Sequence, residues 1–359
     1  MDDSSVLIHL LIALMLANVM PILNSSVENP QIDPELDEFD LVYPNGFSVQ
    51  SEEIVVWNNK SVYLAGTLTV KGQLLLENTT LTYGHNSTMN SSIVIQGSMV
   101  IRDLDGDPGT EYDSSHLIAI NDTFVNVTPS EVIGTIQINS STVTGFNISG
   151  INTQVLNSTL TNCSVRDIGL NSHLRSSHFF GPGTGVGLKV EKDMALDLER
   201  CLFSGYEDSV EIGSGSIRIL DSVISNTTNG VLLGEGAQLF IKNCTVSSIN
   251  SCMISSGESY IKGSKFLNGS LFFNGSKAWI YDTKFGGTKT LNGVDNGIIS
   301  GSEFVDCQTA LEGITHTKVI GNRFEDCYHG LIETDSCEVY HNIFSSIVYP
   351  VSGALTSTY

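Results

Sequence analysis

The sequence predicts an all-β solenoid in which the chain winds through about 13–14 stacked coils. Its C-terminal third repeats at a spacing of 19 to 20 residues, and apolar and polar residues alternate within each repeat. β-Branched residues, Ser, Thr, Asn and Gly dominate, and no segment after residue 24 keeps a helical period. A coil this short cannot bury its own apolar side, so successive coils are expected to stack about 4.8 Å apart around one core.

One large apolar residue anchors each repeat. The clearest repeats, Gly297–Cys307, Thr317–Cys327 and Cys337–Phe344, align on their phenylalanines. The predicted anchors, read from the C-terminus, are Phe344, Phe324, Phe304, Phe285, Phe266, Val246, Ile224, Phe203, Phe179, Leu160, Val143, Val125, Val100 and Leu81. An aliphatic residue five positions earlier is predicted to face the same core: Val339, Val319, Ile299, Ile280, Ile261, Ile241, Ile219, Leu198, Leu174, Val155, Ile138, Ile120, Ile95 and Leu76.

The ends of the chain are expected to lie outside the solenoid. Residues 1–24 contain the apolar run Val6–Ala17, which is 12 residues long, as in a signal peptide, and short for a membrane span. Because Asp2 and Asp3 precede this run, an uncleaved N-terminal anchor stays open as the alternative. Residues 25–52 are predicted to be an acidic linker or cap, 53–350 the solenoid and 351–359 a C-terminal tail. An open last coil would expose strand edges on which a second copy could pair.

The segment Gly321-Asn-Arg-Phe-Glu-Asp-Cys-Tyr-His-Gly330-Leu-Ile, followed by His341-Asn-Ile-Phe344, carries a family pattern. It resembles the right-handed parallel β-helix superfamily, with its NosD-like and pectate-lyase-like repeats, over about residues 55–350. The resemblance implies a single-stranded right-handed parallel β-helix. It implies no one activity, because this fold carries lyases, hydrolases, binding proteins and surface proteins.

Charge and sequons bear on partners and compartment. The net charge is −22, and no basic patch is visible in the sequence. Both observations argue against binding of nucleic acid, whose phosphates need basic residues to neutralise them. Fifteen Asn-x-Ser/Thr sequons occur, which together with the apolar N-terminal run predict an extracellular or cell-surface glycoprotein. The alternative interpretation is that turns rich in Asn, Ser and Thr create sequons as a by-product. The predicted glycosylation sites are Asn59, Asn78, Asn121, Asn139, Asn157, Asn226, Asn243, Asn268 and Asn274.

Two further features suggest bonds or ions. Cys307 and Cys327 occupy the same position in adjacent coils, within reach of a disulfide, and a stacked pair of free thiols is the alternative. An inserted acidic segment offers alternating oxygen ligands that suit Ca²⁺, although Pro108 excludes an EF-hand loop. A solvated acidic turn is the alternative. The candidate calcium ligands are Asp103, Asp105, Asp107, Glu111 and Asp113.

An outward-facing aromatic row is the candidate glycan-binding site. Phe240, Tyr260 and Trp279 take the same position in three consecutive repeats, and Tyr281 follows two residues after Trp279. Sugar rings stack on such aromatic faces. The alternatives are cross-strand packing that stabilises the sheet, or docking of the 25–50 segment.

The candidate catalytic residues lie near the C-terminus. Asp306 and Asp326 share a position in adjacent coils, with Arg323 and His329 nearby. Two stacked carboxylates about 5 Å apart can share a proton, can bind a cation together, or can point away from each other into the solvent. The resemblance implies that a lyase would use calcium-binding acidic residues together with a basic residue. It implies that a hydrolase would use two carboxylates on either side of the glycosidic bond. Neither set of residues is complete in this sequence.

Two functions therefore stay open. The sequence favours a non-catalytic surface β-helix protein that binds polysaccharide or surface glycans, or assembles with other envelope proteins. The second is a carbohydrate-active enzyme, a polysaccharide lyase or glycoside hydrolase acting on acidic polysaccharide.

Overall fold

The computed structural model describes residues 36–84, 92–103, 115–119, 125–129, 134–166, 172–191 and 193–353. The chain divides into two compact units, Met1–Glu38 and Phe39–Tyr359. In the first unit the described residues form one 3₁₀ turn, Leu36–Glu38. Among the described residues no helix has the length and apolar character needed to cross a membrane.

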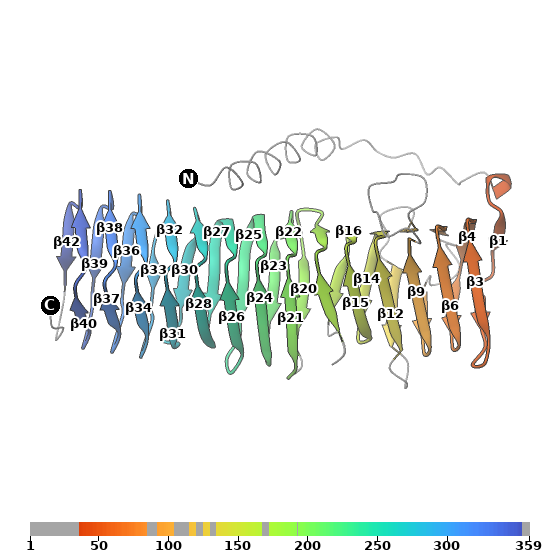
Figure 1. Cartoon of the computed structure of the whole chain (residues 1–359), viewed down its shortest axis with the longest axis horizontal. Helices are drawn as coiled ribbons and strands as arrows, with labels where there is room; N and C mark the ends of the chain where they lie inside the picture. The colour runs from red at the N-terminus through yellow and green to blue at the C-terminus, as the bar shows by residue number, and fades with distance from the viewer. Residues whose placement is uncertain are drawn as a thin grey trace. The chain divides into compact units, whose positions relative to one another are not determined.

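The second unit is an all-β solenoid whose strands pair only in parallel. One sheet has 14 strands, one from each coil, stacked in chain order (Figure 1). These are β3 (Ile54–Asn58), β6 (Gln73–Glu77), β9 (Ser98–Arg102), β12 (Thr135–Asn139), β15 (Asn152–Leu156), β18 (His173–Arg175), β21 (Ala195–Glu199), β24 (Ser216–Leu220), β26 (Gln238–Lys242), β28 (Glu258–Lys262), β31 (Ala278–Tyr281), β34 (Ile298–Ser300), β37 (Lys318–Ile320) and β40 (Glu338–Tyr340). The predicted solenoid of about 14 coils is confirmed.

A 28-stranded sheet completes each coil and consists of two ladders. The anchor ladder contains β1 (Leu41–Tyr43), β4 (Ser61–Ala65), β7 (Thr80–Gly84), β10 (His116–Ala119), β13 (Thr142–Thr144), β16 (Thr159–Thr161), β19 (His178–Phe180), β22 (Leu202–Ser204), β25 (Val223–Leu233), β27 (Thr245–Ser255), β29 (Lys265–Leu267), β32 (Lys284–Gly286), β35 (Glu303–Val305), β38 (Arg323–Glu325) and β41 (Ile343–Ser345).

The return ladder carries the chain back towards the 14-stranded sheet. It contains β2 (Phe47–Val49), β5 (Thr67–Val70), β8 (Ser92–Ile95), β11 (Val125–Pro129), β14 (Phe146–Ser149), β17 (Ser164–Arg166), β20 (Val186–Val190), β23 (Asp208–Ile212), β30 (Ser270–Phe273), β33 (Leu291–Asn292), β36 (Thr309–Glu312), β39 (His329–Ile332) and β42 (Tyr349–Ser352). The 11-residue strands β25 and β27 run through both ladders and join them.

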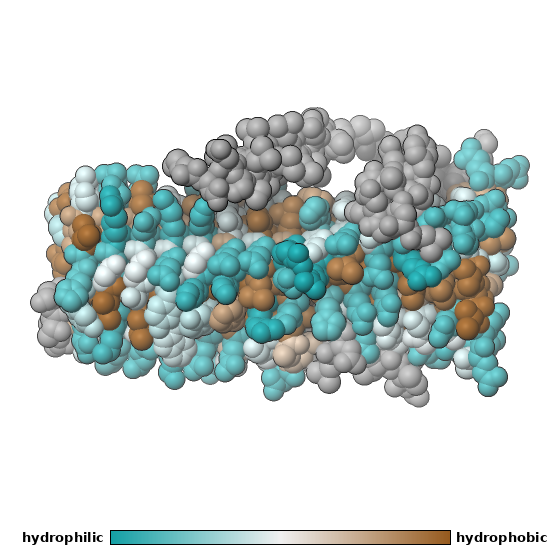
Figure 2. Space-filling model, viewed as in Figure 1, coloured by the Kyte–Doolittle hydropathy of each residue, from teal (hydrophilic) through white to brown (hydrophobic). Residues whose placement is uncertain are grey.

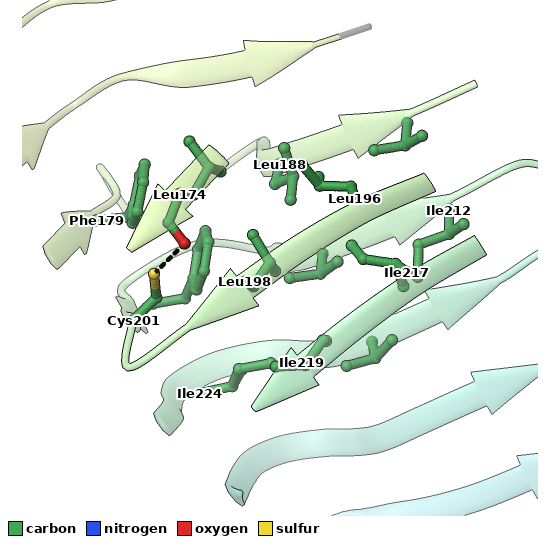
Figure 3. Packing of buried hydrophobic residues seen from close by; sticks show 14 of the residues in the cluster. Leu174, Phe179, Leu188, Leu196, Leu198, Cys201, Ile212, Ile217, Ile219 and Ile224 are labelled. Atoms are coloured by element: carbon green, nitrogen blue, oxygen red, sulfur yellow. Dashed lines mark hydrogen bonds between the residues drawn. The ribbon is translucent and has the colours of Figure 1, made fainter. Parts of the chain in front are cut away.

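A column of phenylalanines fills the core behind the anchor ladder. Phe266, Phe285, Phe304, Phe324 and Phe344 are register partners in successive coils. Their ring centroids lie 4.6–5.6 Å apart, with interplanar angles of 15° or less. Most other core side chains are aliphatic, and Figure 3 shows leucines and isoleucines that pack between the strands in one part of the interior. The predicted column of stacked anchors is therefore confirmed in this part of the chain.

Three of the predicted core positions, Val125, Val100 and Ile95, belong to other positions in the coil. Leu117, not Val125 or Val100, fills the anchor column between Leu81 and Val143. Ile101 likewise fills the aliphatic column between Leu76 and Ile138. Val125 begins β11 and Ile95 ends β8, both in the return ladder, Val100 lies on the outer side of β9, and Ile120 lies outside the described residues.

The misassignment has a physical reason. Both sheets send apolar residues inward with the same two-residue period, so alternation alone does not show to which ladder a run belongs. A count in steps of about 20 therefore fails where a coil lengthens. Thr79 and Ser115, equivalent positions in consecutive coils, are 36 residues apart.

Thirteen of the coils bend between the 14-stranded sheet and the anchor ladder at one left-handed residue. In the described coils φ there lies between 48° and 64°, a conformation that favours Gly, Asn and Asp. These residues are Asn59, Asn78, Ser140, Asn157, Ser176, Arg200, Asp221, Asn243, Gly263, Asp282, Gly301, Gly321 and His341.

An internal polar ladder follows this bend, one residue further along each coil. The Asn322 Oδ1 accepts the backbone N–H of Ser302 at 2.9 Å, and Asn342 Oδ1 accepts that of Asn322 at 2.9 Å. In other coils a serine hydroxyl has the same role, as when Ser222 Oγ accepts the N–H of Cys201 at 3.0 Å. These buried donors would otherwise lack a partner at the bend, where the strand pairing stops.

The first coil begins inside the segment predicted as an acidic linker or cap. The strands β1 and β2 pair with β4 and β5, so Leu41–Val49 belongs to the stack. The Tyr43, Phe47 and Trp57 rings pack together with centroids 4.5–5.6 Å apart. Because β1 and β2 belong to the first coil, Leu41–Val49 does not dock on the aromatic row of β26, β28 and β31.

Candidate ligand-binding face

The aromatic row lies on the outer side of the 14-stranded sheet. Phe240, Tyr260 and Trp279 are register partners on β26, β28 and β31, and Ile298 continues the row on β34. All four side chains are half-buried, while the residues that flank them on each strand point into the core. Tyr281 lies two residues after Trp279 and so shares its face. The predicted juxtaposition of the four aromatic residues is thus present.

The rings of this row differ in what covers them. The Phe240 and Tyr260 rings stack at 4.9 Å with an interplanar angle of 4°, so each covers a face of the other. This geometry favours the cross-strand packing interpretation for that pair. Tyr260 and Tyr281 meet at 5.6 Å and 42°. Trp279 makes no ring contact within the described part of the chain, which leaves its indole as the aromatic surface best suited to a ligand.

A second outward row runs beside the aromatic one. Lys242, Lys262 and Tyr281 are register partners, and both lysines are exposed. Burial, and the neighbouring Tyr260, raise the pKa of Tyr281, so its hydroxyl stays neutral at physiological pH and can donate a hydrogen bond. The aromatic row is therefore bordered by hydrogen-bonding and cationic groups.

Ion pairs separate this face from its surroundings. Arg218 pairs with Asp197 in the coils before Phe240. In the coils after Ile298, Lys318 pairs with Glu338 at 3.0 Å. Figure 2 shows that hydrophobic residues on the visible face form separate groups among hydrophilic ones. The aromatic row lies between these paired charges, because Arg218 is the register partner of Phe240 and Lys318 that of Ile298.

Asp306 and Asp326 lie in turns of the backbone. Both are exposed left-handed residues, with φ of 55° and 53°, directly after β35 and β38. The backbone N–H of Asp306 donates to the carbonyl of Glu325 at 3.2 Å, which places the two turns in adjacent coils. Equivalent turns hold Asn268 and Gly287, so this position selects residues for conformation.

The other two catalytic candidates have partners elsewhere. The guanidinium of Arg323 donates from Nε and Nη2 to both carboxylate oxygens of Glu325, at 3.0 and 2.9 Å. His329 lies in β39, and its ring stacks on Tyr349 at 5.0 Å and meets Tyr328 edge-on at 4.7 Å. No ion pair joins Arg323 or His329 to Asp306 or Asp326 among the described residues. The catalytic role of these residues stays a prediction.

The cysteines form part of the core. All seven are free thiols and all are buried. Cys307 and Cys327 lie in adjacent coils, and Cys307 Sγ lies 3.0 Å from the hydroxyl of Thr288. The hydrogen bond shared with Cys327, together with burial, raises the pKa of Cys307.

Thiol titration distinguishes free thiols from a disulfide. Because every sulfur is buried, we expect an aromatic disulfide reagent to modify none of the seven thiols in the native protein and all seven after unfolding in denaturant. The measurement is the absorbance of the released thiolate, on protein purified without reductant. Two fewer reactive thiols after unfolding, restored by a reductant, would instead establish the Cys307–Cys327 disulfide.

The acidic segment lies largely outside the described residues, which include only Asp103 of its five predicted ligands. Asp103 follows β9 and is 7% exposed. In the part of the chain that the structure describes, no three His, Cys, Asp or Glu side chains are grouped to hold a metal ion. Calcium binding by this segment stays a prediction.

The sequons coincide with turns. Asn59, Asn78, Asn157, Asn226, Asn243 and Asn268 are all left-handed residues with φ between 48° and 70°. Asparagine is favoured there, and in all of these sequons except that of Asn226, which lies inside β25, the Ser or Thr begins the next strand, for which Thr has high propensity. This favours the by-product interpretation of their number. Asn139 ends β12, exposed Asn274 follows β30, and Asn121 lies outside the described residues. Occupancy by glycans stays a prediction.

A comparison with protein families identifies the repeats. A family model described as NosD, periplasmic copper-binding protein, matches residues 171–354, just over half of the 359 residues. This chain belongs to the NosD family. No match is found among the curated proteins. NosD-family membership agrees with the resemblance seen in the sequence and with the parallel β-solenoid, whose coils from β18 to β42 are those that the model covers.

Two buried thiols of this NosD-family chain, Cys201 and Cys244, do not fit a copper ion. Copper takes imidazole, thioether or thiolate ligands. Burial raises the pKa of Cys201 to about 11 and that of Cys244 to about 11, so these thiols stay protonated at neutral pH. Their sulfur atoms donate instead to backbone carbonyls, as from Cys201 to Leu174 at 3.4 Å (Figure 3). The absence of a metal-binding cluster among the described side chains agrees with this.

Proposed function

We propose that this NosD-family protein is an exported, non-catalytic β-helix protein that binds glycans on the outer face of its 14-stranded sheet. The observation that supports it is the position of Trp279, half-buried on the outward row and without a stacked aromatic partner among the described residues. An indole ring offers a flat apolar surface on which a sugar ring stacks. Tyr281 lies on the same strand and face and supplies a hydroxyl beside that surface.

Export rests on two supports. The family description names a periplasmic protein, and the apolar run at residues 6–17 resembles a signal peptide. A cell-surface location, glycosylation, and pairing with a second copy or with other envelope proteins belong to the same proposal and rest on the sequence alone.

Trp279→Ala is expected to weaken glycan binding by about tenfold, equivalent to about 1.4 kcal/mol. The reason is the loss of the aromatic surface while the hydroxyls of the neighbouring tyrosines remain. Binding is measured by affinity electrophoresis in gels containing polysaccharide and by a glycan array.

Two controls accompany that variant. Tyr328→Ala removes an exposed tyrosine, 51% exposed, that lies just before β39 of the return ladder and off the 14-stranded sheet, and should leave binding unchanged. In a Trp57→Phe background Trp279 is the sole remaining tryptophan, so quenching of its fluorescence by sugar reports contact directly. Unchanged retention of Trp279→Ala on every bound glycan would remove the aromatic face from the proposal.

The enzyme hypothesis makes a different prediction. A lyase acting at Asp306, Asp326, Arg323 and His329 would release unsaturated oligosaccharides, detected by their enol-ether absorbance, from uronate polymers. A hydrolase would release reducing ends. Either product, abolished by Asp326→Asn, would replace the binding proposal with catalysis.

A further inference from the structure

Lysines gather beside the aromatic row. The lysine cluster comprises Lys242 and Lys262, which end β26 and β28, and Lys265 and Lys284, which begin β29 and β32. All four side chains are exposed. Lys242 and Lys262 are register partners, as are Lys265 and Lys284, so the cluster forms two columns on either side of the bend at Gly263.

Three of these lysines lack a carboxylate partner. Lys284 lies 3.7 Å from Glu303, whereas Lys242, Lys262 and Lys265 make no ion pair within the described residues. The side chain of Asp221, at the neighbouring bend, accepts a hydrogen bond from Asn243 at 3.0 Å. Two other lysines nearby are paired: Lys277, just before β31, with Glu258 at 3.4 Å, and Lys318 on β37 with Glu338 at 3.0 Å.

Without a bound ligand, this arrangement of lysines is electrostatically unfavourable. Like charges directly opposite each other on parallel strands repel, and the strands of adjacent coils are only about 4.8 Å apart. The chain has 17 basic and 39 acidic residues, so a local group of lysines in register that form no ion pair among the described residues is opposite in sign to the net charge of the protein. A bound polyanion would neutralise both columns and relieve the repulsion.

We infer that the ligand of this face is an anionic polysaccharide, carrying carboxylate or sulfate groups, that lies along the solenoid axis. Trp279 and Tyr281 contact its sugar rings, and Lys242 and Lys262 contact its acidic groups. Tyr281 and Lys262 are register partners, so a chain running along this row passes from a cationic to an aromatic contact within one coil. The inference rests on the glycan binding proposed above and names the class of glycan.

The test compares four polymers with the full-length protein by biolayer interferometry. The polymers are alginate, dextran sulfate, neutral dextran and polyglutamate. We expect alginate or dextran sulfate to bind at least tenfold more tightly than neutral dextran, with an affinity that falls as salt concentration rises. The Lys242→Gln/Lys262→Gln double variant should lose at least tenfold in affinity for the acidic glycan and keep the thermal melting curve of the parent.

A matched control separates local from general charge. Lys318→Gln removes the same charge from the same sheet, at a lysine already paired with Glu338, and should change affinity less than twofold. An equal loss in the control would overturn the inference. Binding of both alginate and dextran sulfate no tighter than that of neutral dextran would also overturn it, although glycan binding would then stand. Equally tight binding of polyglutamate would also overturn it, because the ligand would be any polyanion. Binding of none of the three glycans would remove the proposed function as well.

Discussion

Phe304→Ala is expected to lower the free energy of unfolding by about 3–5 kcal/mol. Phe304 is fully buried, and its ring stacks between Phe285 at 4.6 Å and Phe324 at 4.9 Å. Alanine would leave a cavity in the column and remove both stacked contacts. Urea denaturation followed by circular dichroism measures the loss.

A neighbouring residue supplies the control for that experiment. Val305 follows Phe304 on β35 but points outward and is half-buried, so Val305→Ala should cost less than about 1 kcal/mol. If both variants lost the same small amount, the phenylalanine column would not be the main support of these coils. Because solenoid stability is a sum over neighbouring coils, hydrogen exchange should locate the loss in the coils around Phe304.

Asn322→Leu is expected to cost about 3 kcal/mol, although leucine is apolar and similar in size. Asn322 is 1% exposed; its Oδ1 accepts the N–H of Ser302, and its Nδ2 donates to the carbonyl of Ile299 at 2.8 Å. Leucine would leave the buried Ser302 N–H without a partner, at about 1–3 kcal/mol, and would also remove the side-chain hydrogen bond to the Ile299 carbonyl. The measurement is again denaturant unfolding.

Asn322→Ser tests the reason for that loss. Serine occupies the equivalent position in other coils, where Ser302 Oγ accepts the N–H of Thr283 at 3.2 Å and donates to the carbonyl of Ser300 at 3.1 Å. Serine at position 322 should therefore recover part of the stability that leucine loses. Equal destabilisation by both substitutions would show that volume, and not hydrogen bonding, determines the choice of residue.

The phenylalanine column could be predicted because each anchor repeats at a nearly constant spacing and points inward. The core positions of Leu117 and Ile101 could not be predicted, because the longer coils interrupt the spacing of about 20 residues. The alternation of apolar and polar residues does not show to which of the two sheets a strand belongs. The polar ladder was visible as Asn and Ser before the anchors, but its bonding pattern is a product of stacking.

The binding face was predicted in part. Register places Phe240, Tyr260 and Trp279 in one row as the repeat indicated, but stacking depends on side-chain torsions that spacing does not determine. Lys242 and Lys262 were missed, although the signal was present. Both precede their anchors by four positions, as Tyr281 does, so the same alignment would have grouped them. The turn conformation of Asp306 could likewise have been inferred from Asn268 and Gly287 at the equivalent position.

The internal polar ladder repeats at a constant step in the coils that contain Ser302, Asn322 and Asn342. The backbone of Ser302 bonds to Asn322, and that of Asn322 to Asn342, at the same separation of 20 residues, so neighbouring coils present matching edges to one another. A duplication or deletion of one such segment by unequal recombination would keep every bond across the new junction. The length of the molecule can thus evolve in whole steps, while the spacing of its surface rows stays constant.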